Sequence, residues 1–395
     1  MSKWVFLKKN QAVLGCLMDS NRMIECRVDN REDSLVGSIY VARIENLVSG
    51  LRAAFLSIGD RTCYYSLAGA AEPVFCRRQR AGLFTAGDEI LVQIEKDAMK
   101  TKDPVARGVL QIGGRYGVVM YPEKGIYFSK KITDESWRDT MKKAFRHRLP
   151  DGFGILLRTN AATASREEIE EEMIRLSTQL QEIIEKAPYR SFGTRLWKPQ
   201  PDYLQTLRDL PMHGVEEIVT DDETLFDELS SALLAYPETA AISCRYYQDR
   251  LLSLEKCYRI PFFLEQVKEK QVWLNSGAYL VIEQTEALTA VDVNTGKATG
   301  NRKEWEAFLF RTNMEAAREI MAQIRLRNLS GIIILDFINM KDPAHQEELL
   351  SCLRSLAVSD PVRTAVIDMT PLGLVEVTRK KEKDTLEKQL SLLQN

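Results

Sequence analysis

The spacing of hydrophobic residues divides the chain into segments with different expected structures. Residues 1–35 hold three short apolar runs that are typical of strands. These runs are too short to bury a core alone, so we expect them to pair with a later segment. Residues 205–270 offer a partner, because an apolar run at 215–219 precedes an amphipathic helix.

Residues 36–118 show the pattern of an all-β domain. Two β-rich runs, at 39–44 and 90–94, are bounded by turn residues, and shorter runs lie between them. This arrangement favours a small barrel of the OB type. Phe55 and Tyr65 are candidate platforms for base stacking, with Lys102 as a nearby cation. The alternative is that both rings fill the barrel interior.

Residues 119–187 combine helical spacing with many basic side chains. Thr133 or Asp134 can cap a first helix, and Ser165 with Glu168 has the spacing of a capping box for a second. The basic residues around the first helix form either a phosphate-reading surface or an ordinary solvated face.

The second half of the chain predicts a linker, an α/β unit and a tail. Residues 188–204 contain three prolines and indicate a linker. In residues 272–376 a long helix separates two apolar strands. Residues 379–395 form a charged helix with leucines on one side, which can cover the domain or meet a partner.

The composition is that of a globular protein. The chain has 395 residues, of which 45% are hydrophobic and 28% charged, enough for two or more domains. Without an apolar run of 18 residues or a signal pattern, we expect a cytoplasmic protein with no membrane partner. The seven cysteines form no C-x-x-C pair, which indicates reduced thiols. With a net charge of -2, any contact with nucleic acid must rest on local patches.

Two apolar strands that each carry an aspartate near their end are the main chemical signal. Asp292 precedes Asn294 by two residues, so in an extended strand both side chains point the same way. Gly296 then lets the backbone turn. Asp336 lies 44 residues after Asp292 (336 minus 292), which leaves room for one strand–helix–strand crossover. We therefore expect parallel strands that bring the carboxylates together.

Adjacent carboxylates suggest a divalent-metal site, because they repel each other unless a cation lies between them. Magnesium accepts a pair of carboxylates and keeps its other positions for water and phosphate oxygens. Asn294 would orient the water or a carboxylate, and Lys297 is a candidate RNA-phosphate contact. The alternative is that the aspartates cap turns or helices. Gly296-Lys297 does not form a P-loop, and without Gly-x-Ser-x-Gly a nucleophilic triad is disfavoured.

At these residues the chain resembles the ribonuclease E/G family. The matching segments are residues 284–296, 312–317, 324–327, 331–338 and 372–380. Weaker similarity, including residues 53–55 and 154–159, extends the resemblance over nearly the whole chain. It implies an endoribonuclease that uses Mg²⁺ to cut single-stranded RNA, leaving a 5′-phosphate and a 3′-hydroxyl. Such an enzyme would act in RNA processing, including that of ribosomal RNA, or in decay.

The resemblance implies roles for three sets of residues. The catalytic set comprises two metal ligands and their supporting residue: Asp292, Asp336 and Asn294. The second set lies on the RNA-binding face of the OB domain: Phe55, Tyr65 and Lys102. The third senses a 5′-monophosphate: Gly125, Arg158 and Thr159.

The resemblance also implies a multidomain fold that combines α+β and α/β parts. An OB-fold RNA-binding domain (36–118) would be inserted in a ribonuclease H-like domain split between 1–35 and 205–270. The remaining parts are a 5′-sensor-like domain, a linker, a deoxyribonuclease I-like catalytic domain and a C-terminal helix. They would span residues 119–187, 188–204, 271–378 and 379–395.

Three departures from the family pattern affect these expectations. The Cys-Pro-x-Cys zinc link does not occur in these residues, so we expect any homodimer to form without it. Asn339 stands where the family usually has Asp, which would weaken the acidity near the metal. Asn160 and the loop 102–104 also differ. Two other hypotheses therefore stay open: a non-catalytic RNA-binding protein that retains the fold, and a structural scaffold without RNA affinity.

Overall fold

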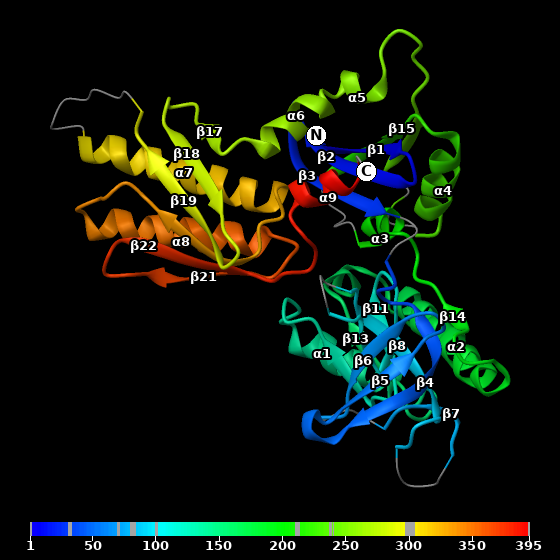
Figure 1. Ribbon diagram of the computed structural model, residues 1–395. Coiled ribbons are helices and arrows are strands. Elements are labelled where there is room, and N and C mark those ends of the chain that lie inside the picture. The colour runs from blue at the N-terminus through cyan, green and yellow to red at the C-terminus, as the bar shows by residue number, and fades with distance from the viewer. Residues whose placement is uncertain are drawn as a thin grey trace. The chain divides into compact units, whose positions relative to one another are not determined.

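The computed structural model forms two compact units (Figure 1). One unit combines residues 1–30 with 212–395, and the other is continuous from 31 to 211. The residues that the structure describes are 2–30, 34–68, 72–79, 84–98, 102–209, 214–236, 239, 241–296 and 305–393.

The first sheet of the discontinuous unit joins the N-terminal strands to a much later segment. Its strand order is β16-β15-β1-β2-β3. An antiparallel meander is formed by β1 (Ser2–Lys9), β2 (Ala12–Asp19) and β3 (Arg22–Asn30). β15 (Val215–Thr220) pairs in parallel with β1, and β16 (Ser243–Tyr246) pairs in parallel with β15. The expected pairing of the early strands with residues near 215 is therefore confirmed.

Helices also belong to this part of the chain, within the residues described. They are α4 (Glu223–Leu234), α5 (Leu254–Cys257), α6 (Ile260–Lys268) and α9 (Leu386–Leu392). Leu386 and Leu390 of α9 are buried in the same hydrophobic cluster as residues of β1, β2 and β3. The C-terminal helix thus covers this sheet, whereas the sequence pattern led us to expect it on the α/β unit or against a partner.

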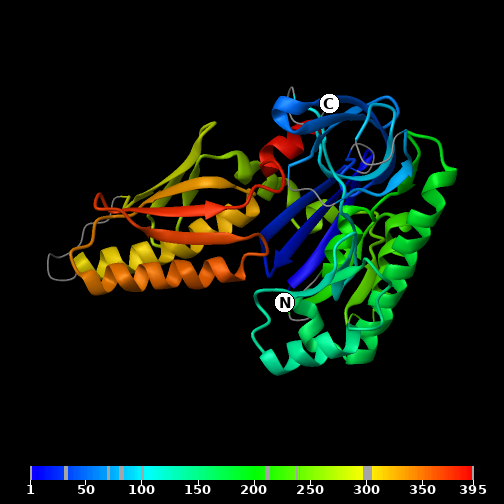
Figure 2. The same ribbon diagram turned by 90° about the horizontal axis from the view of Figure 1, so that it is seen from below.

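The second sheet of this unit has six strands in the order β17-β18-β19-β20-β22-β21. The strands are β17 (Gln271–Trp273), β18 (Tyr279–Gln284), β19 (Leu288–Asn294), β20 (Gly331–Asp336), β21 (Thr364–Met369) and β22 (Leu374–Arg379). Two long helices, α7 (Trp305–Leu326) and α8 (Pro343–Ser359), lie on one side of the sheet (Figure 2). Alternate strand residues such as Val291 and Leu335 pack with them in one core.

The continuous unit begins with a closed five-stranded barrel, which is compatible with the expected OB type. Its ring of strands is β4-β5-β6-β9-β8, and β8 pairs back to β4. The strands are β4 (Ile39–Val48), β5 (Ala53–Ser57), β6 (Thr62–Ser66), β8 (Glu89–Lys96) and β9 (Val105–Arg107). Short strands β7 (Phe75–Arg77) and β14 (Arg195–Trp197) extend its edges. The expected linker therefore contains an edge strand, where the nearby prolines are tolerated.

A four-stranded sheet in the order β10-β11-β13-β12 follows the barrel. Its strands are β10 (Leu110–Gly113), β11 (Gly117–Tyr121), β12 (Gly125–Phe128) and β13 (Gly154–Leu157). The helices of this region are α1 (Glu135–Phe145), α2 (Arg166–Lys186) and α3 (Asp202–Asp209). Asp134 caps α1, and the predicted capping box of Ser165 and Glu168 starts α2. Among the helices described here, none has the length and apolar character needed to cross a membrane.

Candidate functional site

β19 and β20 place Asp292 and Asp336 side by side. The strands are parallel, and Asp292 lies directly opposite Asp336 in their register. Neighbouring strands are about 4.8 Å apart, and opposed residues point to the same face. Val291 and Leu335, one position earlier, are buried under α7 and α8, so both aspartates lie exposed on the opposite face. The expected crossover with parallel strands is confirmed.

Asn294 supports Asp292 from the same strand. Its side-chain amide donates a hydrogen bond of 2.7 Å to Asp292 Oδ2, which confirms the expected shared orientation. Gly296 follows with a φ of 66°, and a Cβ there would lie 2.4 Å from the carbonyl oxygen of Gly277. Only glycine fits this turn, which ends the strand directly after the Asp292–Asn294 pair. Lys297, the candidate RNA contact, lies outside the described residues.

The buried face of α7 holds the segment that follows Asp336. Asn313 is 0% exposed; its amide donates to the carbonyl oxygen of Ile338 at 2.7 Å and accepts from the Ile338 N–H at 3.1 Å. Because buried backbone groups require partners, this pair of bonds fixes the chain two residues beyond Asp336. The sequence pattern assigns no role to Asn313. A polar residue among the apolar positions of a long helix is nevertheless a signal that its side chain has a structural role.

The donor set around the two aspartates fits a magnesium ion. Within the described ranges, neither carboxylate has a lysine or arginine partner, and Asp292 is bonded to the neutral Asn294. Two like charges at this spacing favour a bound cation. The same residues contain no group of three or more His, Cys, Asp or Glu side chains that could hold a metal. Two carboxylates with open positions for water and phosphate suit magnesium.

Asn339, which departs from the family pattern, lies just beyond this site. Its side chain is exposed, and its Oδ1 would be 3.3 Å from a Cβ placed on Gly373. It therefore faces the turn between β21 and β22. Its effect on the acidity near a metal stays a prediction.

The barrel corrects the expected role of one aromatic residue. Tyr65 is 1% exposed and belongs to the barrel core, where burial raises the pKa of its hydroxyl to about 12. A buried ring cannot stack on a base, so the alternative that it fills the barrel is correct. Because successive strand residues point to opposite faces, Tyr64 points outward instead.

Phe55 and Lys102 remain accessible on the barrel. Phe55 is half-buried and pairs across the strands with Tyr64; their ring centroids are 6.1 Å apart in an edge-to-face arrangement. Lys102 is exposed, and the loop that contains it passes Tyr64, whose N–H donates to Pro104 at 2.8 Å. The sequence pattern does not single out Tyr64, because the run of Cys63, Tyr64 and Tyr65 alone does not show which positions of the strand face outward.

The predicted 5′-sensing residues occupy two ends of one strand pair. Arg158 donates to Asp209 at 2.6 Å, and the Thr159 hydroxyl lies 2.9 Å from that of Ser129. Burial lowers the pKa of the Arg158 guanidinium, and Asp209 counteracts this effect. Gly125 instead pairs with Gly154, about 13 Å along the strand from Arg158 at 3.3 Å per residue. Arg158 and Thr159 are thus brought together, whereas Gly125 is not.

The chain is similar to known bacterial ribonucleases. Residues 111–382 match the model of the Ribonuclease E/G family. Ribonuclease G of Escherichia coli (strain K12) is 30% identical over 364 residues, which cover 89% of this chain and 74% of that protein.

Two cyanobacterial proteins named ribonuclease E are also similar. The protein from Synechocystis sp. is 32% identical over 361 residues, covering 89% of this chain and 53% of its own length. The protein from Nostoc sp. is 34% identical over 358 residues, covering 88% of this chain and 51% of its own. The chain therefore spans about half the length of these two relatives.

Proposed function

The chain belongs to the ribonuclease E/G family, and we propose that it is a magnesium-dependent endoribonuclease acting on single-stranded RNA. The cut leaves a 5′-phosphate and a 3′-hydroxyl, and its substrates are RNAs in processing, including ribosomal RNA, or in decay. Support comes from the names of the curated relatives, ribonuclease G and ribonuclease E. The observation that carries the proposal is the register that sets Asp292 opposite Asp336 on an exposed sheet face.

The proposed chemistry assigns a separate task to each residue of the site. Asp292 and Asp336 would hold the magnesium ion, which would activate a water and stabilise negative charge on the phosphodiester. Asn294 keeps the Asp292 carboxylate in one orientation through its hydrogen bond. Asn313 fixes the chain behind Asp336, so that both carboxylates are positioned before RNA binds.

Further parts of the proposal concern RNA binding and the fold. Phe55 and Lys102 contact RNA on the barrel. Arg158 and Thr159 bind a 5′-phosphate, and for this Arg158 must replace its hydrogen bond to Asp209 with one to the phosphate. The meander extended by two parallel strands supports a ribonuclease H-like assignment for the first sheet. The six-stranded sheet with its two long helices supports the deoxyribonuclease I-like assignment.

The test compares isosteric variants of the two aspartates with a matched control. We expect Asp292→Asn and Asp336→Asn each to lower the cleavage rate of a short unstructured RNA by about 100-fold or more, or about 2.7 kcal/mol. The control is Glu283→Gln, because Glu283 is exposed on the same face of the adjacent strand and pairs with Lys270. The Glu283→Gln variant should cleave within about twofold of the parent, since it removes a charge but leaves Asp292 and Asp336 unchanged.

The readouts separate catalysis from binding. Cleavage is followed with magnesium and with EDTA, on RNAs carrying a 5′-monophosphate or a 5′-hydroxyl. RNA affinity is measured in EDTA and should be nearly equal for all variants. Full activity of the double Asp292→Asn/Asp336→Asn variant would contradict the proposal. RNA binding by the parent without any cleavage would favour the non-catalytic alternative, which the Asn339 departure motivates.

A further inference from the structure

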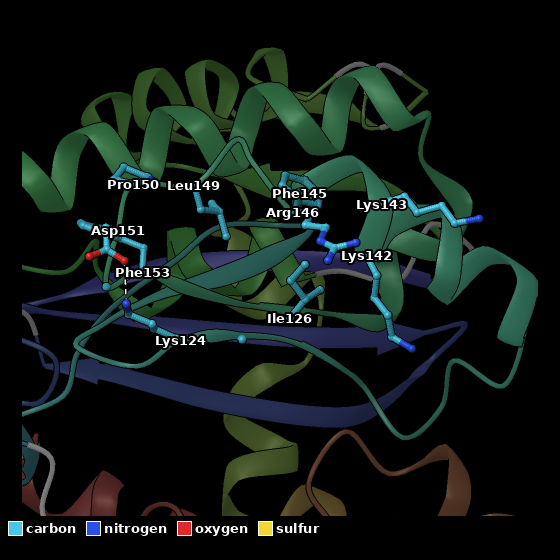
Figure 3. A pocket seen from close by; sticks show the side chains of 12 residues that line it. Lys124, Ile126, Lys142, Lys143, Phe145, Arg146, Leu149, Pro150, Asp151 and Phe153 are labelled. Atoms are coloured by element: carbon cyan, nitrogen blue, oxygen red, sulfur yellow. Dashed lines mark hydrogen bonds and ion pairs between the residues drawn. The ribbon is translucent and has the colours of Figure 1, made fainter.

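A cavity of about 550 Å³ opens beside the four-stranded sheet, between β12 and the end of α1. Its walls come from β12, from the last turn of α1 and from the loop that leads into β13 (Figure 3). Gly125, one of the three predicted 5′-sensing residues, lines the cavity, whereas Arg158 and Thr159 do not, so the cavity is separate from that pair. The volume lies within the range typical of ligand sites.

The floor of the cavity is apolar. Its accessible surface comes from Ile126 and Leu149, which are half-buried, and Phe145 and Phe153 lie buried beneath it. These side chains belong to the core of this region or pack against it, so the floor is set by the fold. A flat apolar ligand would bury surface here at about 25 cal/mol per Å².

The rim of the cavity is positively charged. Lys142, Lys143 and Arg146 extend from the end of α1 at one end of the cavity, and Lys124 lies with Asp151 at the other (Figure 3). Lys124 pairs with Asp151 at 2.6 Å, and Lys142 pairs with Asp139 at 3.0 Å. Lys143 and Arg146 are exposed and have no carboxylate partner among the residues described.

The helix alone does not account for this combination. Cations in the last turn of a helix interact favourably with its dipole, which explains the charge on α1. It does not explain why the apolar side chains of Ile126 and Leu149 stay partly accessible beside two unpaired cations. Nucleotides combine the matching features, because each base has a flat apolar face and each phosphate a negative charge.

We propose that this cavity binds one nucleotide of an RNA chain, with the base on the floor beside Leu149 and the phosphate on Lys143 and Arg146. The inference rests on the proposed function for its choice of RNA as the partner. It adds an anchoring site in the continuous unit, whereas the carboxylates belong to the other unit. A terminal phosphate is not required, so the site holds RNA with any 5′ end.

The first test compares two double variants that lose the same charge. Lys143→Gln/Arg146→Gln removes the unpaired cations of the rim. The control, Arg175→Gln/Lys186→Gln, removes two exposed cations of α2 that do not line the cavity. The probe is hexauridylate with a 5′-hydroxyl and a 3′-fluorescein, and its binding to the full chain is measured in EDTA.

We expect the rim variant to bind about 5- to 20-fold more weakly and the control within about twofold, since two phosphate contacts are lost. The slope of log K against log salt should fall by about 1.4, which is 0.7 for each contact on a single strand. Equal affinities of the two double variants would overturn the proposal. Thermal melting of both variants identifies any loss of folding, and unchanged melting assigns the effect to the rim.

The second test locates the bound base. Hexauridylate containing one 4-thiouridine is cross-linked to the protein, which is then digested with trypsin. We expect the cross-link in the peptide 149–158, which contains Leu149 and Phe153, and we expect the rim variant to lose it. Cross-links that all lie elsewhere would overturn the proposal, because they would show that RNA does not bind in the cavity. The proposal would also be overturned if uridine monophosphate and unlabelled hexauridylate reduced the cross-link equally, because the cavity would then be a site for free nucleotides.

These tests fail independently of the proposed function. They are run in EDTA and do not depend on cleavage. RNA anchoring without magnesium-dependent cleavage would contradict the proposed function alone. Normal cleavage with an unchanged affinity of the rim variant would contradict the anchoring site alone.

Discussion

At the scale of single residues, a shift of one position decides which tyrosine of β6 can meet RNA. Tyr64 lies on the outer side of the barrel beside Phe55, and Tyr65 fills the interior. Because strand side chains alternate with a period of two, neighbouring residues of the same type have opposite environments. We therefore expect any stacking on RNA bases in this stretch to involve Phe55 and Tyr64.

We predict opposite consequences for substitutions at the two tyrosines. Tyr64→Ala should weaken binding to single-stranded RNA by about 1–3 kcal/mol, the value of one stacked base, with little change in melting temperature. Tyr65→Ala should destabilise the fold by about 3–5 kcal/mol, because it leaves a cavity in the core.

Fluorescence anisotropy in EDTA and thermal melting distinguish the two effects. Tyr65→Phe serves as the control, since the buried Tyr65 hydroxyl has no hydrogen-bond partner among the described residues. It should retain both RNA affinity and stability. Loss of RNA affinity in a stably folded Tyr65→Phe variant would contradict the assignment.

The same residues show what the sequence can predict. The pattern identifies Asp292 and Asn294 because they are two residues apart in a strand, and Asp336 because one strand–helix–strand crossover accounts for its distance in sequence. Tyr65 was misassigned because the run of Cys63, Tyr64 and Tyr65 does not reveal which parity faces inward. The partner of a residue distant in sequence, such as Asp209 for Arg158, is set by tertiary packing and has no local signal.

At the scale of elements, local sequence patterns predict where α1 and α2 begin and that one crossover joins β19 to β20. They do not predict the course of the loops. The capping residues of α1 and α2 were evident because capping depends on a few consecutive side chains. The cavity beside α1 was not, because it depends on how the loop before β13 returns to the sheet. The sequence shows the basic residues at its rim, but only the fold shows that they lie beside an apolar floor.

One buried ion pair joins the end of α8 to the end of β22 in the six-stranded sheet. Asp360 caps the end of α8 and accepts a bond of 2.8 Å from Arg379, the last residue of β22; both side chains are nearly inaccessible. Burial raises the pKa of Asp360, but the hydrogen bonds and charge of Arg379 outweigh this effect, so its pKa lies below the usual range. The charged form of Asp360 is therefore the one that stabilises the fold.

We predict that Asp360→Asn destabilises the protein by about 3 kcal/mol at neutral pH, because it leaves Arg379 buried without its counter-charge. A group with a depressed folded pKa stabilises fully above its unfolded value of about 3.9 and loses this effect as pH falls through the folded pKa. The difference between parent and variant should therefore be largest near pH 7 and shrink below about pH 4. Urea unfolding at several pH values measures it.

The matched control for this pair is an exposed aspartate of the neighbouring strand. Asp368→Asn on β21 removes the same charge from an exposed position and should change stability by less than about 0.5 kcal/mol. A pH-independent difference for Asp360→Asn would show that the charge of Asp360 is not the source of its stabilising effect.

At the scale of the whole molecule, each unit contains its own hydrophobic cores. Two clusters, one inside the barrel and one around the four-stranded sheet, draw all their residues from the continuous unit 31–211. Two others draw theirs from the discontinuous unit. The continuous unit has a size typical of one domain, so its burial should suffice for independent folding.

We predict that the fragment 31–211 folds alone, melts cooperatively, binds hexauridylate in EDTA and does not cleave RNA, because it lacks Asp292 and Asp336. The fragment 31–187 is its control, since it lacks β14, which pairs with β4, and Arg208, which donates to Gly113 at 2.9 Å. Loss of the edge strand and of this bond should lower its melting temperature. Circular dichroism and anisotropy measure both properties. A fragment 31–211 that fails to melt cooperatively, or one that is no more stable than 31–187, would contradict the assignment of a self-contained RNA-binding unit.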